Sequence, residues 1–109
     1  MNDEQVAMDL IIHAGNAKSL AMEAIGAAKK SEFDEAKEKL RLAGESLQTA
    51  HVLQTEILEY SLGSSGVSML MVHAQDQLMD AMTILAMAGE FMDLYKLVYT
   101  NIPAARRDA

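Results

Sequence analysis

Apolar residues recur at alternating spacings of three and four along most of the chain, which is the period of an amphipathic helix. No stretch alternates apolar and polar residues as a strand does, and the one proline, Pro103, follows the last periodic segment. The pattern predicts helices at about residues 3–29, 32–60 and 67–99, with the Gly-Ser-Ser-Gly stretch at 63–66 as a connection. We therefore expect an all-α protein, an antiparallel three-helix bundle.

Local signals refine the predicted ends. Ser31, with Asp34 three residues later, resembles a capping box and predicts Ser31 as the N-cap of the second helix. We expect residues 1–100 to form a single domain. Residues 101–109 contain little that could anchor them, so they are predicted to be a flexible C-terminal tail.

The third predicted helix is apolar on nearly every side between Val67 and Met92. A helix of that kind needs to be buried on all sides, but two neighbours in a bundle cannot cover it. Three helices near 30 residues also make a rod, roughly 50 Å long at about 1.5 Å per residue. We expect copies of the chain to associate symmetrically and bury the surplus apolar face.

The composition narrows the range of functions. The 109 residues have 16 acidic and 9 basic side chains, a net charge of −7, which argues against nucleic acid or an anionic membrane as a partner. The chain has no cysteine, so disulfides and thiolate chemistry are excluded. It begins with no signal-type apolar run and contains no stretch typical of a membrane span, so we expect a cytoplasmic protein.

Four polar residues interrupt the third helix on one side. His73, Asp76, Gln77 and Asp80 fall within roughly 100° of arc, and we call them the polar stripe. Such groups cost stability in an apolar helix unless they are paired, hydrated or bound to a ligand. The spacing fits a structural polar layer and a functional site equally well. His73 and Asp76 are too few ligands for a metal site within one chain, and no serine or threonine on the stripe completes a hydrolase triad.

Asp76 lies among apolar positions of this helix. If the helix packs around a symmetry axis, copies of Asp76 meet and repel one another, and a divalent cation with oxygen ligands would relieve the repulsion. His13 and His51, in contrast, each stand alone on a helix face, and we interpret them as structural residues.

The stripe lies inside a family-specific block. Val72-His73-Ala74-Gln75-Asp76, followed by Leu78-Met79, resembles the active-site signature of the lactose/cellobiose-specific IIA component of the bacterial phosphoenolpyruvate-dependent sugar phosphotransferase system. The resemblance extends from about Val6 to Val98. Its other blocks are residues 14–19, 50–51, 54–55 and 91–96.

The resemblance implies a homotrimer, a nine-helix assembly of three-helix bundles. His73 falls on the histidine that is phosphorylated, and Asp76 on an aspartate that binds a divalent cation, such as magnesium, at the trimer axis. It also implies a phosphotransferase component that takes a phosphoryl group from the histidine-containing phosphocarrier protein and passes it to the cysteine of a IIB component. IIB then phosphorylates a β-linked disaccharide of the cellobiose, chitobiose or lactose class at the membrane transporter IIC, and the IIA component does not bind the sugar.

Two residues depart from the family pattern. Gln77 stands where a second histidine is common, and Asp80 where threonine or serine is frequent. Gln77 can donate or accept a hydrogen bond but cannot carry a proton at neutral pH, and Asp80 adds charge that opposes phosphorylation of His73. A histidine inside a helix has no free backbone N–H groups nearby, and the stripe has no lysine or arginine. We therefore expect phosphate or partner contacts from Gln77 and Gln75, or from another chain.

Two other functions fit the residues without the resemblance. One is a non-catalytic interaction module with a structural polar layer, and the other is an oligomeric bundle whose function is to bind a metal. Acid-labile, base-stable phosphorylation of His73 distinguishes a carrier from the first alternative. Metal dependence of phosphoryl transfer distinguishes it from the second.

Overall fold

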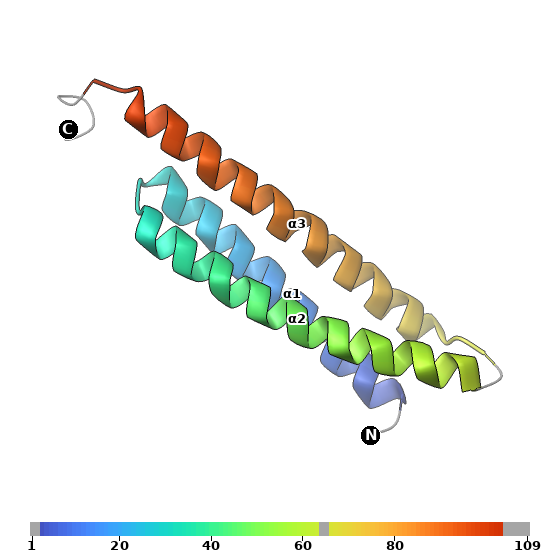
Figure 1. Ribbon diagram of the computed structural model, residues 1–109. Coiled ribbons are helices and arrows are strands. Elements are labelled where there is room, and N and C mark those ends of the chain that lie inside the picture. Colours follow the sequence, from blue (N-terminus) through green and yellow to red (C-terminus); the bar gives the residue numbers. More distant parts are fainter. Residues whose placement is uncertain (1–2, 64–65, 104–109) are drawn as a thin grey trace.

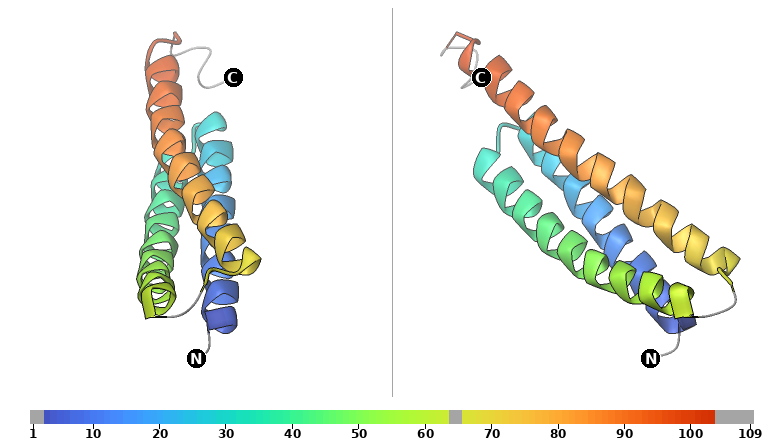
Figure 2. Two further views of the ribbon diagram at one scale, coloured as in Figure 1. Left: turned by 90° about the vertical axis from the view of Figure 1, so that its right-hand side faces the viewer. Right: turned by 45° about the vertical axis from the view of Figure 1, so that its right-hand side comes forward.

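The computed structural model describes residues 3–63 and 66–103. They form three helices, α1 (Asp3–Lys29), α2 (Phe33–Gly63) and α3 (Met69–Thr100). α2 runs antiparallel to its two neighbours, so α1 and α3 point in the same direction (Figure 1). The molecule is a rod of 64 × 17 × 16 Å, and α3 extends beyond the turn between α1 and α2 (Figure 2). The predicted all-α three-helix bundle is confirmed.

Two helix ends differ from the prediction by two or three residues. α2 continues to Gly63. α3 begins at Met69 because Ser68 is its N-cap, with the Ser68 hydroxyl accepting a hydrogen bond from the backbone N–H of Met71 at 3.1 Å. Residues 64–65 of the predicted connection and 104–109 of the predicted tail lie outside the described residues.

Ser31 ends α1 instead of capping α2. Its N–H donates to the carbonyl of Ala28 at 3.0 Å, and the N–H of Glu32 donates to the carbonyl of Ala27 at 2.9 Å, which together form a Schellman motif. Ser31 has a φ of 63°, the left-handed conformation that this motif requires. An N-cap residue is extended, so one serine cannot serve both roles, and the capping-box prediction was wrong.

We expect Ser31→Gly to stabilise the protein by about 1 kcal/mol, because glycine adopts a positive φ without the steric cost that Ser31 bears. The shift in the midpoint of denaturant unfolding measures this effect. Ser31→Ala is the matched control, since it removes the hydroxyl but keeps the Cβ atom, and it should give no gain. An equal gain from both variants would contradict the prediction.

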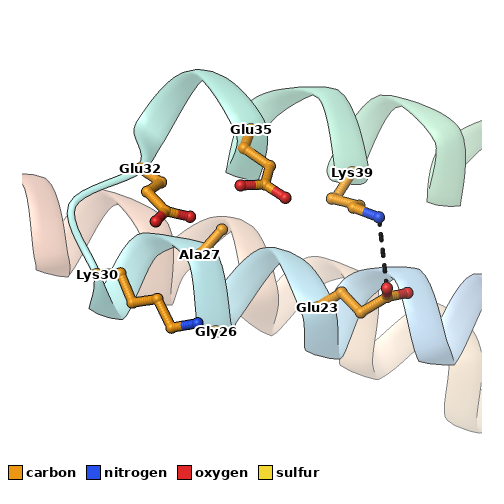
Figure 3. Close-up of a pocket in the computed structure, with 7 residues that line it drawn as sticks. All are labelled: Glu23, Gly26, Ala27, Lys30, Glu32, Glu35 and Lys39. Atoms are coloured by element: carbon orange, nitrogen blue, oxygen red, sulfur yellow. Dashed lines mark hydrogen bonds and ion pairs between the residues drawn. The ribbon is translucent and has the colours of Figure 1, made fainter.

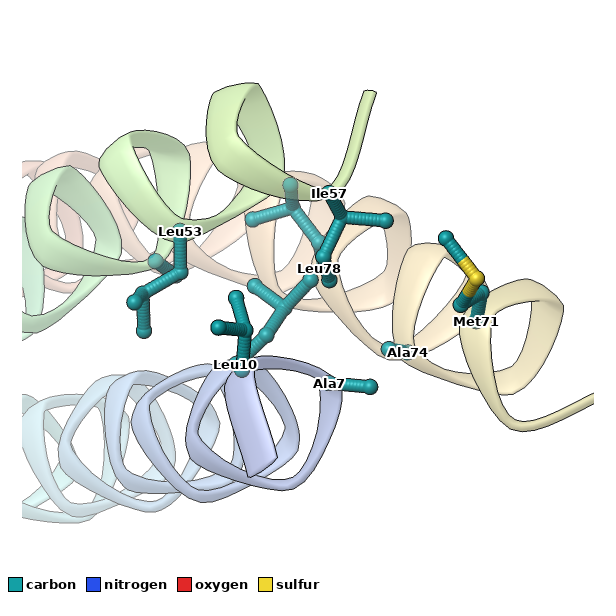
Figure 4. Close-up of a cluster of buried hydrophobic side chains, with 9 residues drawn as sticks. Ala7, Leu10, Leu53, Ile57, Met71, Ala74 and Leu78 are labelled. Atoms are coloured by element: carbon teal, nitrogen blue, oxygen red, sulfur yellow. The ribbon is translucent and has the colours of Figure 1, made fainter. Parts of the chain in front are cut away.

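The core is a seam of small side chains along the rod. Of the nineteen apolar residues buried in the described part of the chain, thirteen are alanine. Larger side chains fill one end, where Leu10 of α1, Ile57 of α2 and Leu78 of α3 point toward one another (Figure 4). The buried positions of α3 follow the predicted periodicity: Met71, Ala74, Leu78, Ala81 and Ala88.

The opposite face of α3 is exposed and apolar. Met69, Val72 and Met79 leave 82%, 45% and 54% of their surface open to solvent. Phe91, Leu94, Leu97 and Val98 continue the exposed apolar residues toward the C-terminal end. Two neighbouring helices therefore leave part of α3 uncovered, as the sequence predicts.

Candidate functional site

The polar stripe lies at the edge of this exposed face, on the side of α1. His73, Asp76 and Asp80 are exposed, and Gln77 is half-buried. At about 100° per residue, Gln77 lies about 40° from His73 around the helix. In a single chain these groups meet water, so they do not carry the desolvation cost of buried polar groups.

His73 lies nearer the helix N-terminus than the sequence predicts. Ser68 is the N-cap of α3, so His73 belongs to its second turn. The helix dipole acts mainly within the first turn, so it contributes little to stabilising charge at His73.

α1 contributes a residue that no pattern within the third helix reveals. The Lys18 ammonium donates a hydrogen bond to Oε1 of Gln77 at 3.0 Å, and both side chains are half-buried. Lys18 makes no ion pair with a carboxylate among the described residues. A positive charge thus lies at the stripe although α3 does not supply it. The sequence signal is a lysine within the small-residue block at 14–19.

Gln75 points to the other side of α3, about 200° around the helix from His73. Its Oε1 accepts a hydrogen bond from Nε2 of Gln54 at 2.7 Å, and Oε1 of Gln54 lies 3.4 Å from Nδ1 of His51. Within one chain, the structure therefore brings Gln77 and His73 together and places Gln75 against α2. His51 therefore does not stand alone on its face but lies beside Gln54, and its interpretation as a structural residue stays a prediction.

Asp76 lies on the exposed apolar face, with Val72 and Met79 exposed beside it. Among residues 3–63 and 66–103, no group of three or more histidine or acidic side chains is placed to hold a metal ion. One copy of Asp76 supplies too few oxygen ligands for a magnesium site. The residue fits such a site only where several chains bring their copies together.

A charged hollow of about 290 Å³ lies at the α1–α2 turn and contains no residue of the stripe. Its lining includes the acidic Glu32 and Glu35 and the basic Lys30. Lys39, which also lines it, pairs with Glu23 at 3.3 Å (Figure 3). The charges of the acidic and basic side chains partly cancel in this hollow.

No helix among the described residues has the length and apolarity of a membrane span.

The family model of the "PTS system, Lactose/Cellobiose specific IIA subunit" matches residues 5–96. The lichenan-specific phosphotransferase enzyme IIA component of Bacillus subtilis is 47% identical over 102 residues, which cover 90% of this chain and 93% of that protein. The N,N'-diacetylchitobiose-specific EIIA component of Escherichia coli K12 is 38% identical, with 85% of this chain and 82% of that protein covered.

Solved structures agree with these relatives. The cellobiose-specific enzyme IIA of Bacillus anthracis superimposes with a TM-score of 0.87 at 39% identity, covering 94% of this chain and 95% of that one. The IIA(Chitobiose) of E. coli, solved in complex with HPr, gives a TM-score of 0.80 at 35% identity, covering 90% and 97%.

The fold and the sequence place the protein among the components of the phosphotransferase system, which transfer phosphoryl groups. The chain belongs to the family of lactose/cellobiose-specific IIA subunits.

Proposed function

We propose that this chain is a phosphohistidine carrier that accepts a phosphoryl group on His73 and passes it to a IIB component. The observation that supports this most strongly is the exposure of His73 on α3, beside the half-buried Gln77. An imidazole held in this way can meet two partner proteins in turn. A histidine that served only a structural polar layer would be buried and paired.

The two transfers are chemically balanced. In the first, a neutral nitrogen of the His73 imidazole bonds to phosphorus while the phosphorus–nitrogen bond of the donor breaks, and the donor imidazole keeps the electron pair. In the second, the thiolate of IIB attacks phosphorus and the His73 imidazole leaves with its electron pair. Phosphoryl transfer depends mainly on alignment and on stabilising charge on the equatorial oxygens.

The proposed donor is the histidine-containing phosphocarrier protein HPr, because the related E. coli IIA(Chitobiose) was solved in complex with HPr. The acceptor is the cysteine of the cognate IIB component, which works with the transporter IIC. The relatives include components specific for lichenan, cellobiose, N,N'-diacetylchitobiose and oligo-beta-mannoside, and one specific for galactose. The pathway served by this chain thus imports a β-linked disaccharide, and the chain itself does not bind the sugar.

The proposed working form is a homotrimer with a divalent cation, magnesium by preference, at the axis. The support is the exposed apolar face of α3, which includes Val72 and Met79 around the carboxylate of Asp76. Three copies of this face would cover one another. Three copies of Asp76 would then supply the oxygen ligands that one chain lacks, and the cation would offset their repulsion.

Transfer of labelled phosphate from phosphorylated HPr to the purified chain tests the proposed function. We expect label that is lost in acid and retained in base, as for a phosphohistidine, and that is discharged when IIB is added. Absence of label on a folded chain would favour a non-catalytic bundle. Label that forms equally well in the presence of a chelator would show that any bound cation is structural and not part of the transfer.

A further inference from the structure

Lys18 stands out because it supplies a positive charge to a stripe whose other charged residues are carboxylates. We propose that Lys18 is a positioning residue for phosphoryl transfer: it holds the amide of Gln77 so that the amide nitrogen faces the phosphoryl group on His73. This inference rests on the proposed function of His73 as the phosphorylated residue.

The chemistry of the hydrogen bond fixes the orientation of the amide. A lysine ammonium can only donate, so its partner on Gln77 at 3.0 Å has to be the oxygen Oε1. The opposite orientation would place N–H groups against N–H groups. With Oε1 turned toward Lys18, Nε2 and its two hydrogens remain, and they have no other partner among the described residues.

The helical spacing of Gln77 and His73 places these donors near the imidazole. Residues four apart on a helix have Cβ atoms about 5–6 Å apart, so the amide of Gln77 lies within one turn of the imidazole.

The charge of Lys18 acts in the same sense. Asp76 and Asp80 flank Gln77 on the exposed side of α3, and their carboxylates oppose a phosphoryl group on His73. The ammonium of Lys18 is half-buried and makes no ion pair with a described carboxylate. It therefore offsets this repulsion, and it polarises the Gln77 amide so that Nε2 becomes a stronger donor.

The test compares rates and equilibria of phosphoryl transfer between HPr and variants of the full chain. We expect Lys18→Met and Gln77→Leu each to slow transfer about tenfold, the effect of one lost hydrogen bond to a charged group. The double variant should be no slower than the slower single variant, because the two residues act as a unit. Lys18→Arg, which keeps the donor and the charge, should retain most of the wild-type rate of transfer.

A matched variant controls for general damage. Lys39→Met removes another half-buried lysine, which pairs with Glu23 at the α1–α2 contact. This variant should transfer at the wild-type rate. In NMR spectra, the side-chain amide signal of Gln77 should shift when His73 is phosphorylated, and this shift should be lost in Lys18→Met.

The outcomes separate this inference from the proposed function. If the wild-type chain takes no label, the proposed function fails. If His73 is labelled normally in Lys18→Met, or if the effects of Lys18→Met and Gln77→Leu multiply in the double variant, the positioning role is wrong while the carrier function stands. If Lys18→Met unfolds, the other two variants still test the inference. A positioning role requires that Lys18→Arg keep most of the transfer rate and that Gln77→Leu lower it.

Discussion

Replacing His73 by alanine is expected to abolish phosphorylation by HPr, with label at least about a thousandfold below that of the wild type. The substitution removes the nucleophile itself, which is the one imidazole of the polar stripe. His73 is exposed, so the free energy of unfolding should change by about 0.5 kcal/mol or less. Transfer of label from HPr, with circular dichroism as a check of folding, measures both effects.

The other two histidines provide the controls. His51 lies in a hydrogen-bonded cluster with Gln54, and His13 is half-buried on α1. His51→Ala and His13→Ala should keep the acid-labile label, although each can lower stability. Label that persists in His73→Ala and disappears in one of these variants would assign the phosphorylated position to a different helix.

Replacing Asp76 by asparagine is expected to remove the dependence of assembly on divalent cations. In the wild type, magnesium at a hundredfold excess over its dissociation constant should stabilise the trimer by about 2.7 kcal/mol per site. Asparagine has no charge, so its copies do not repel at the axis and need no cation. The Asp76→Asn trimer should therefore be insensitive to chelator, as measured by sedimentation and thermal unfolding.

Asp80→Asn is the matched control, because it removes the same charge one turn away on the exposed side of α3. The cation dependence of assembly should survive in this variant. A wild-type chain that is equally stable with magnesium and with chelator would refute the axial site. If the wild-type chain sedimented as a monomer at all concentrations, the trimer would be refuted as well.

The helical period carries most of the information on the fold. Small and apolar residues at spacings of three and four predicted the three helices and the uncovered face of α3. Helix ends depend on single hydrogen bonds, which periodicity does not detect. α3 begins at Met69 because the hydroxyl of Ser68 caps the backbone there. Ser31, just after α1, is left-handed because two backbone hydrogen bonds close the Schellman motif there.

The site was predictable only where its residues share one helix. His73 and Gln77 are a turn apart on α3, so their proximity followed from sequence spacing alone. Lys18 comes from a helix more than fifty positions earlier, and its contact with Gln77 depends on the register between α1 and α3. Gln75 lies near His73 in sequence but on the opposite side of α3, where it accepts a hydrogen bond from Gln54.

The alanine-rich core has a consequence for how the protein exists at low concentration. An alanine buries only one methyl group, so a core of thirteen alanines among nineteen buried apolar residues gains less free energy per residue than a core of leucines. In the proposed trimer, burial of the exposed α3 face would then supply much of the stability. Folding and association would become one equilibrium governed by mass action, and dilution alone should lower the melting temperature.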